Sequence, residues 1–151
     1  MILNVFEVNT SENLINRLNN LSIESKARWG KMNVAQMLAH CNVTYELVYE
    51  NTHKPPNFLM KLLFKFFIKK FIVNEIPYKQ NLGTAPAFII TNERDFIREK
   101  ARLKDFIKQT QQLGASYFEG KESISFGKLT ANEWNNMFYK HLDHHFKQFE
   151  V

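Results

Sequence analysis

Residues 134–149 (WNNMFYKHLDHHFKQF) limit the possible folds more than any other stretch, because their apolar side chains recur with the period of an α-helix. Thr130 and Glu133, just before this stretch, match the S/T-x-x-E capping box that begins a helix. Winding the stretch at about 100° per residue places Trp134 and Phe138 on one stripe, and a helix buries such a stripe. The sequence therefore predicts a C-terminal helix with one face in the core.

The same winding places two histidines of this stretch on its inward face. His141 and His145 lie one turn apart, where Cβ atoms are about 5–6 Å from each other. A zinc–nitrogen bond is about 2.0–2.1 Å long, so two such imidazoles can chelate one ion. His144 winds to the edge of the stripe, nearer Lys140 and Lys147, and is the alternative ligand or a residue of the second shell. Because H-x-x-x-H pairs also occur in ordinary cores and surfaces, a metal site needs a third ligand from elsewhere.

Composition favours a helical protein of one domain. At 151 residues the chain can bury a core, and we expect a single domain over residues 1–151. Fourteen phenylalanines against five glycines and four prolines favour long helices over a barrel or sandwich, which need many turns. Helical patterns over 11–21, from Asn33 onward and over 92–113 bring the main helices to four, whereas prolines and a glycine predict an irregular crossing segment over 74–91. The expected fold is all-α, an antiparallel four-helix bundle, where metal sites are commonly built between facing helices.

Charge and cysteine content narrow the partners and the compartment. The net charge of +5 permits an acidic partner, but the sequence has no glycine loop for phosphate and no nucleic-acid-binding motif, so nucleic acid is not expected. Cys41 is the lone cysteine, which excludes an intrachain disulfide. The N-terminal residues lack the basic and apolar regions of a signal peptide, and we therefore expect a cytoplasmic protein.

The helix that starts near Asn33 carries a third inward histidine. Asn33, with a glutamine three residues later, resembles a capping box. Winding this helix places His40 beside Met37 and Thr44 on the inward side, and Asn42 on the opposite face. Taken alone, His40 reads as a core histidine satisfied by a hydrogen bond. Together with two inward histidines in the C-terminal helix, it favours a shared metal, because each buried imidazole needs a partner.

Residues 57–73 (NFLMKLLFKFFIKKFIV) form the most apolar segment and are expected to be an accessory amphipathic helix. Lys61, Lys65 and Lys69 recur every four residues, and 17 residues with four lysines fall short of a membrane span. The helix either packs over the bundle, its lysines reaching solvent, or lies on a membrane surface. The first interpretation is favoured, because so much apolar surface is costly to expose in a soluble monomer. Burial against the bundle or in a homodimer interface is expected for Leu62, Leu63, Phe66, Phe67 and Phe71.

Three motifs resemble the DinB-like (DinB/YfiT-type) superfamily, and in particular a branch whose members are domains of unknown function. The motifs are QMLAHC at residues 36–41 after a WGKM turn, TAPAF at 84–88, and YKHLDHHFKQF at 139–149. The likeness covers nearly the whole chain, and the C-terminal motif is its most specific part. It implies a four-helix bundle in which three histidines hold a divalent metal ion.

The resemblance assigns each implied ligand to one position of this chain. His40 matches the ligand from the second helix, and His141 and His145 match the pair from the last helix. Gln148 follows the pair as in the family's H-x-x-x-H-x-x-Q pattern, whereas His144 has no counterpart among the family's usual ligands. Helical winding selects the same pair independently.

A site of three histidines leaves coordination positions for water or substrate, as catalytic metal sites do. Zinc or nickel is the expected metal, with iron as a further candidate, because imidazole suits all three. Leu142 follows His141 where an H-E-x-x-H peptidase has its glutamate, which argues against a peptidase. Some DinB-like relatives are metal-dependent transferases that act with low-molecular-weight thiols, so the resemblance implies that chemistry. The alternatives are a metal-dependent hydrolase and a binding or stress-response module without turnover.

A mostly apolar pocket between the second and the last helix is expected to receive the small-molecule substrate. Met37 and Thr44 would line it from one helix, and Trp134 and Phe138 from the other. A metal can deprotonate a coordinating thiol, so a thiol held there would act as thiolate without a glutamate base.

Overall fold

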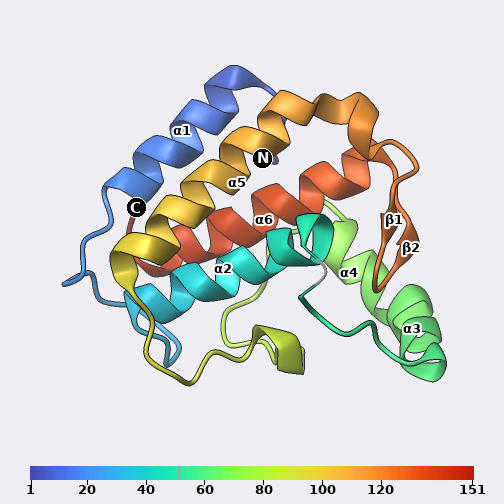
Figure 1. The fold of residues 1–151 in the computed structure, drawn as a ribbon, viewed down its shortest axis with the longest axis horizontal. Coiled ribbons are helices and arrows are strands. Elements are labelled where there is room, and N and C mark those ends of the chain that lie inside the picture. The colour runs from blue at the N-terminus through green and yellow to red at the C-terminus, as the bar shows by residue number, and fades with distance from the viewer. Residues whose placement is uncertain (51) are drawn as a thin grey trace.

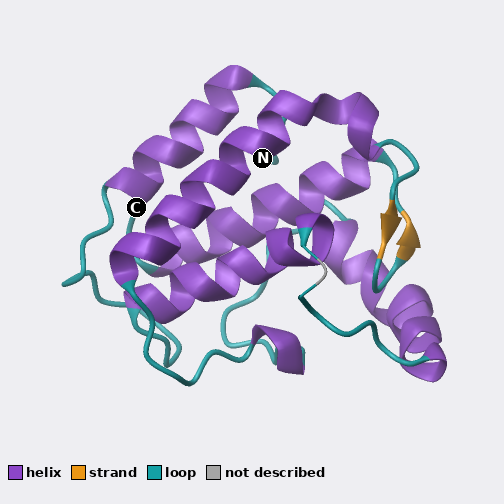
Figure 2. Ribbon diagram, in the orientation of Figure 1, coloured by secondary structure: helices purple, strands orange, loops and turns teal. Residues whose placement is uncertain are grey.

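Four long helices form the main body of the structure, a computed structural model that describes residues 1–50 and 52–151 (Figures 1 and 2). They are α1 (Val8–Asn19), α2 (Val34–Tyr49), α5 (Phe96–Phe118) and α6 (Ala131–Gln148). Helix α5 contacts α1, α2 and α6, and α6 also contacts α1 and α2. A short antiparallel hairpin, β1 (Glu122–Ser123) and β2 (Gly127–Lys128), lies between α5 and α6 in the chain. The described part of the chain is therefore predominantly helical, as predicted.

Both predicted capping boxes are present, and they begin the two helices that carry the candidate histidines. At the start of α2, the Asn33 side chain accepts from the backbone N–H of Gln36 at 2.9 Å, and the Gln36 side chain accepts from the N–H of Asn33 at 3.1 Å. Thr130 and Glu133 form the same reciprocal pair at the start of α6, at 3.2 and 2.9 Å. Each box satisfies two N–H groups that a helix start leaves without partners, so local sequence sets where these helices begin.

The bounds of α1 and α5 differ from the predicted ranges 11–21 and 92–113. Helix α1 begins at Val8, three residues earlier than predicted. Gly114 in α5 has φ of +70°, as a glycine that ends a helix does, but another helical turn follows and ends at Phe118. Phe118 is fully buried, with its ring 5.2 Å from that of Phe6 and 5.7 Å from that of Trp134. Core packing of this one side chain explains why the chain stays helical beyond the glycine.

Helix α2 is buried on opposite faces, because α5 and α6 both pack against it. The prediction that Asn42 faces outward is therefore wrong. Its side-chain amide is fully buried and donates to the backbone carbonyl and the carboxylate of Glu99 in α5, at 3.0 and 2.8 Å. Arg102 donates to the same carboxylate at 3.1 Å. Helical winding predicts a polar face to be exposed, but this polar face of α2 is buried against α5, so winding alone gives the wrong surroundings for Asn42.

The apolar segment 57–73 is helical but irregular. Helices α3 (Phe58–Leu63) and α4 (Lys69–Val73) flank a π-helical turn, η1 (Phe64–Ile68). Helix α4 lies against α6, where the ammonium of Lys140 donates to three carbonyls at the C-terminal end of α4. Helix α3 extends beyond the four long helices (Figure 1).

The expected burial of this segment's apolar side chains within the chain is wrong. Leu62 is partly buried, and the other four are exposed: Leu63, Phe66, Phe67 and Phe71. Lys61 and Lys69 reach back to the protein instead, and pair with Glu122 and Glu133 at 3.3 and 2.8 Å. Part of the lysine stripe therefore faces the protein, and the apolar side faces away from it. Burial in a homodimer interface stays a prediction.

Residues 74–91 are irregular, as predicted, apart from a 3-10 turn, η2 (Pro86–Phe88), that contacts α2. This contact brings Phe88 to the candidate site, far in sequence from both histidine motifs. Within the described residues, no helix combines the length and the apolar character that crossing a membrane requires.

Candidate metal centre

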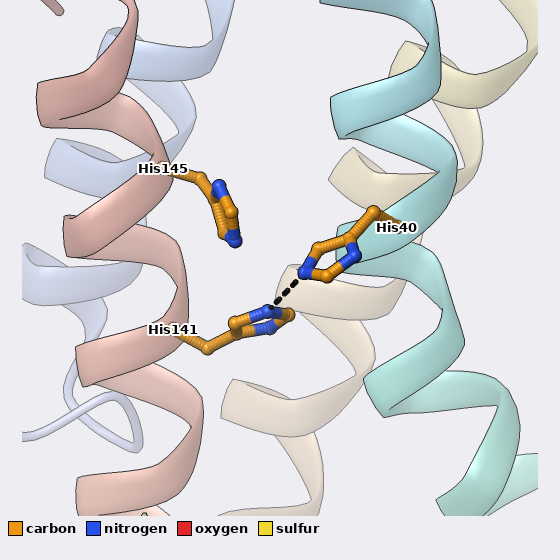
Figure 3. A group of neighbouring side chains, drawn as sticks. All are labelled: His40, His141 and His145. Atoms are coloured by element: carbon orange, nitrogen blue, oxygen red, sulfur yellow. Dashed lines mark hydrogen bonds between the residues drawn. The ribbon is translucent and has the colours of Figure 1, made fainter. Parts of the chain in front are cut away.

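Three histidine side chains meet between α2 and α6. Figure 3 shows His40 extending from α2 toward His141 and His145 of α6. One ring nitrogen of each residue lies within 4.8 Å of the other two, and the Nε2 atoms of His40 and His141 are 2.9 Å apart. His40 and His145 are buried, while His141 is partly exposed. The geometry brings together the three residues that helical winding and the family resemblance both select, in an arrangement that is compatible with a metal site.

Each imidazole is held from behind by an oxygen atom. The Nδ1 atoms have partners at 2.8 Å, namely the carbonyl of Phe88 for His40, the hydroxyl of Thr44 for His141 and the side-chain carbonyl of Gln148 for His145. Such partners set the ring orientation of metal-ligating histidines and raise their basicity. The outer nitrogens are thus occupied, and the three rings turn their Nε2 atoms to a common centre.

Hydrogen-bond chemistry fixes two of the three tautomers. The carbonyls of Phe88 and Gln148 can only accept, so neutral His40 and His145 carry their protons on Nδ1 and a lone pair on Nε2. His141 has a choice, because the Thr44 hydroxyl can donate or accept. Without an ion, His141 donates from Nε2 to His40; as a ligand, it would donate from Nδ1 to Thr44. The donor set therefore suits a metal ion once the proton of His141 moves from Nε2 to Nδ1 and the Thr44 hydroxyl turns to accept it.

The loop before α2 positions Gln148. The side-chain N–H of Gln148 donates to the carbonyl of Trp29 at 2.6 Å, which orients its carbonyl toward His145. Gly30 has φ of +81°, and a Cβ at this position would lie 2.7 Å from Nε2 of Gln148. A residue with a side chain at Gly30 would both strain the backbone and push against Gln148. The glycine therefore lets the loop approach the end of α6 closely enough to hold it.

The electrostatic environment keeps the three imidazoles neutral. Burial lowers the pKa of His40, and it lowers that of His141 well below the ordinary value, with further lowering by the neighbouring histidines. The pKa of His145 falls to about 3, mainly through burial and then through proximity to His40. Neutral imidazole is the form that binds a metal, so the site is poised for ligation at neutral pH.

We expect the metal-free protein to lose stability as the pH falls below about 6.5. The unfolded chain binds protons at the ordinary histidine pKa of about 6.5, whereas the folded chain holds these histidines neutral to lower pH. The stabilisation is complete above pH 6.5 and is lost as the pH falls toward the folded-state pKa of about 3 for His145. The loss is at most ~1.4 kcal/mol per pH unit for each histidine. Urea unfolding of chelator-treated protein at pH 7.5 and 5.5 measures the loss. If a His145→Gln variant lost as much stability between pH 7.5 and 5.5 as the unmodified protein, His145 would not contribute to this pH dependence.

His144 lies outside the cluster. Its ring packs edge-on at 5.0 Å from that of His145, and it lies 5.8 Å from Trp29 and 6.0 Å from Tyr78. Together with Trp29, Tyr78 and Lys140 it lines a cavity of about 160 Å³. A role for His144 behind the ligands, or as the alternative ligand, stays a prediction.

The residues expected to line a substrate pocket occupy different surroundings. Thr44 contacts His141, and Met37 is fully buried. Trp134 and Phe138 stack on each other in the aromatic core, with ring centroids 5.6 Å apart, and neither is more than 2% exposed. The lining of a substrate pocket by these four residues stays a prediction.

Sequence reasoning assigned no site role to Phe88. Its carbonyl holds His40, and its ring packs edge-on against His40 and His141, at 5.4 and 5.9 Å. The available signal was the TAPAF motif at 84–88, which was used only as a mark of resemblance. A backbone carbonyl leaves no trace in residue type, so the contact itself could not be read from the sequence.

Comparison with known proteins places the chain in a family. No curated protein and no solved structure gives a significant match. The profile of one family, described as "Protein of unknown function (DUF1569)", matches residues 3–151. This match covers nearly the whole chain, including all three histidines of the cluster. The chain therefore belongs to the DUF1569 family of proteins of unknown function.

Proposed function

We propose that this protein is a DinB-like metalloprotein with a four-helix bundle, in which His40, His141 and His145 hold one divalent ion for transfer of a low-molecular-weight thiol to a small electrophile. The observation that carries the proposal is the shared geometry of the three rings. Each Nδ1 atom is hydrogen-bonded to an oxygen, and each Nε2 atom faces the same point. The Nε2 lone pairs of His40 and His145 point toward the same centre, where they repel each other without a partner and would be stabilised by a cation.

The number and kind of ligands support a reactive site over a closed structural one. Structural zinc sites have four protein ligands, whereas the cluster offers three and has one partly exposed member, His141. Zinc or nickel is the proposed ion, with iron as a further candidate. A divalent ion there would supply a Lewis acid that favours the thiolate form of a thiol at neutral pH.

The thiol has to come from a small molecule. Cys41 is fully buried, and burial raises the pKa of its thiol, so this side chain is neither accessible nor ionised at neutral pH. Its free state agrees with the reducing cytoplasm in which we place the protein.

The carboxylates of the chain give hydrolysis less support. A water-activating mechanism uses a general base within reach of the site. Asp143 is the nearest carboxylate in sequence to both α6 histidines, but it pairs with Arg17 and Lys147 at 2.9 and 2.7 Å. Thiol transfer makes no such demand, because the ion itself lowers the thiol pKa.

The test is conjugate formation by protein loaded with zinc, nickel or iron. A panel of low-molecular-weight thiols is incubated with a chromogenic aryl halide, and the coloured thioether is followed as halide and a proton are released. We expect a metal-dependent rate with at least one thiol, absent in His141→Ala and retained in His144→Ala. If no thiol gives a rate above the His141→Ala background with any metal, the transferase proposal fails, and a metal-binding module without turnover remains.

A further inference from the structure

The segment from Phe58 to Phe71 presents large apolar side chains to solvent. Five of them are more than half exposed: Phe58 (78%), Leu59 (73%), Phe66 (66%), Phe67 (63%) and Phe71 (59%). They share one continuous helical run, α3, η1 and α4, whose C-terminal end is fastened to α6 through Lys140. Burial of one such side chain is worth about 1.5–3 kcal/mol, and exposed clusters of this kind mark interaction surfaces. We call these five residues the apolar face.

The net charge of the protein arises from the chain segment that contains the apolar face. Residues 54–79 contain six lysines and one glutamate, a formal charge of +5, which equals the net charge of the whole chain. The rest of the chain is therefore neutral, with fourteen basic and fourteen acidic residues. Lys61 and Lys69 are paired with Glu122 and Glu133, and among the described residues the other four lysines form no ion pair. The potential around the apolar face is thus positive.

Lysines and aromatic rings are immediate neighbours at this surface. The ammonium of Lys65 lies 5.9 Å from the ring centre of Phe66, and that of Lys70 lies 5.0 Å from the ring centre of Phe71. All four side chains are exposed. A ring that enters the acyl boundary would leave its neighbouring ammonium at the level of the lipid phosphates, which is how basic amphipathic helices lie on membranes.

We infer that the apolar face docks on an anionic lipid bilayer, with Phe66, Phe67 and Phe71 in the interface and Lys65 and Lys70 on the head groups. Charge decides between this occupant and a second copy of the chain. Two copies that meet face to face would bring the unpaired lysines of one segment against those of the other, whereas an anionic surface attracts each nearby lysine by about 1 kcal/mol. The protein then lies on the membrane without crossing it. This inference does not rest on the metal centre or on the proposed transferase activity.

Vesicle sedimentation tests the inference on the full chain. The protein is mixed with vesicles of phosphatidylcholine alone, or with about 30% phosphatidylserine, at about 0.1 and 0.5 M salt. We expect binding to the anionic vesicles, and at least tenfold weaker binding to neutral vesicles or at high salt. A Phe66→Ser/Phe67→Ser variant should bind at least tenfold more weakly, and Lys65→Glu/Lys70→Glu should also lose the salt dependence.

Matched controls carry the same chemical changes on exposed residues elsewhere. Ile23→Ser/Ile97→Ser and Lys26→Glu/Lys108→Glu should bind vesicles as the unmodified protein does. Circular dichroism of each variant checks that the fold is intact. The inference is overturned if vesicles are not bound, if neutral and anionic vesicles are bound equally, or if the serine variant binds normally. It is also overturned if light scattering shows a dimer that Phe66→Ser/Phe67→Ser dissociates, because a second copy would then cover the apolar face.

Discussion

His145→Ala should reduce the metal content of the protein from one ion per chain to almost none, whereas His144→Ala should leave it unchanged. The two residues are neighbours of the same type on α6, but only His145 belongs to the cluster. Two remaining imidazoles give too few ligands for a tight site. Elemental analysis of protein purified without a histidine tag measures the difference. Normal metal content in His145→Ala would contradict the proposed ligand, and a loss in His144→Ala would assign it to that residue instead.

The same variants should separate in their thermal stability. The ion would link α2 to α6, and a ligand that binds only the folded state stabilises it by about 4 kcal/mol when its concentration is a thousand times its Kd. Calorimetry should therefore show a higher Tm with metal for the unmodified protein and for His144→Ala, but no shift for His145→Ala.

Gln148→Ala should have an effect on metal affinity between those of His144→Ala and His145→Ala. It removes only the oxygen that orients His145, and loss of such a partner typically weakens metal affinity by about 10–100-fold. An affinity equal to that of the unmodified protein would show that the ring needs no support from Gln148.

Phe138→Ala should destabilise the protein by about 3–5 kcal/mol, the usual cost of removing a buried phenyl ring. Phe138 is fully buried, and its ring packs against three other aromatic rings. The ring centroids of Tyr45, Phe118 and Trp134 lie at 5.0, 5.5 and 5.6 Å. Because these rings come from α2, α5 and α6, the cavity would loosen the contacts among three helices at once.

Urea unfolding in the presence of a chelator measures this cost without a contribution from metal. Phe67→Ala is the matched control, since it makes the same change at a side chain that is 63% exposed, and it should alter the free energy of unfolding by less than about 0.5 kcal/mol. Equal effects of the two substitutions would mean that the aromatic cluster is not the core of the folded protein.

Features that depend on neighbours within a few residues could be predicted from the order of the amino acids alone. The boxes at Asn33 and Thr130 begin α2 and α6 as predicted, because a capping box is closed by side chains three residues apart. The α-helical period then places His141 and His145 on one face and turns His144 aside, as the structure shows. For the same reason, the choice of candidate histidines on α6 needed no tertiary information.

Features that depend on which helices and loops meet became visible in the folded protein alone. His40 reaches His141 across 101 positions, and a backbone carbonyl in η2 holds its ring. Asn42 is buried because α5 covers a face of α2 that looks polar in the sequence. Phe66 is exposed because its helix is fastened to the protein by other side chains, although its hydrophobicity favours burial. Residue type records how much a side chain gains from burial, but the long-range arrangement of helices decides which side chains are buried.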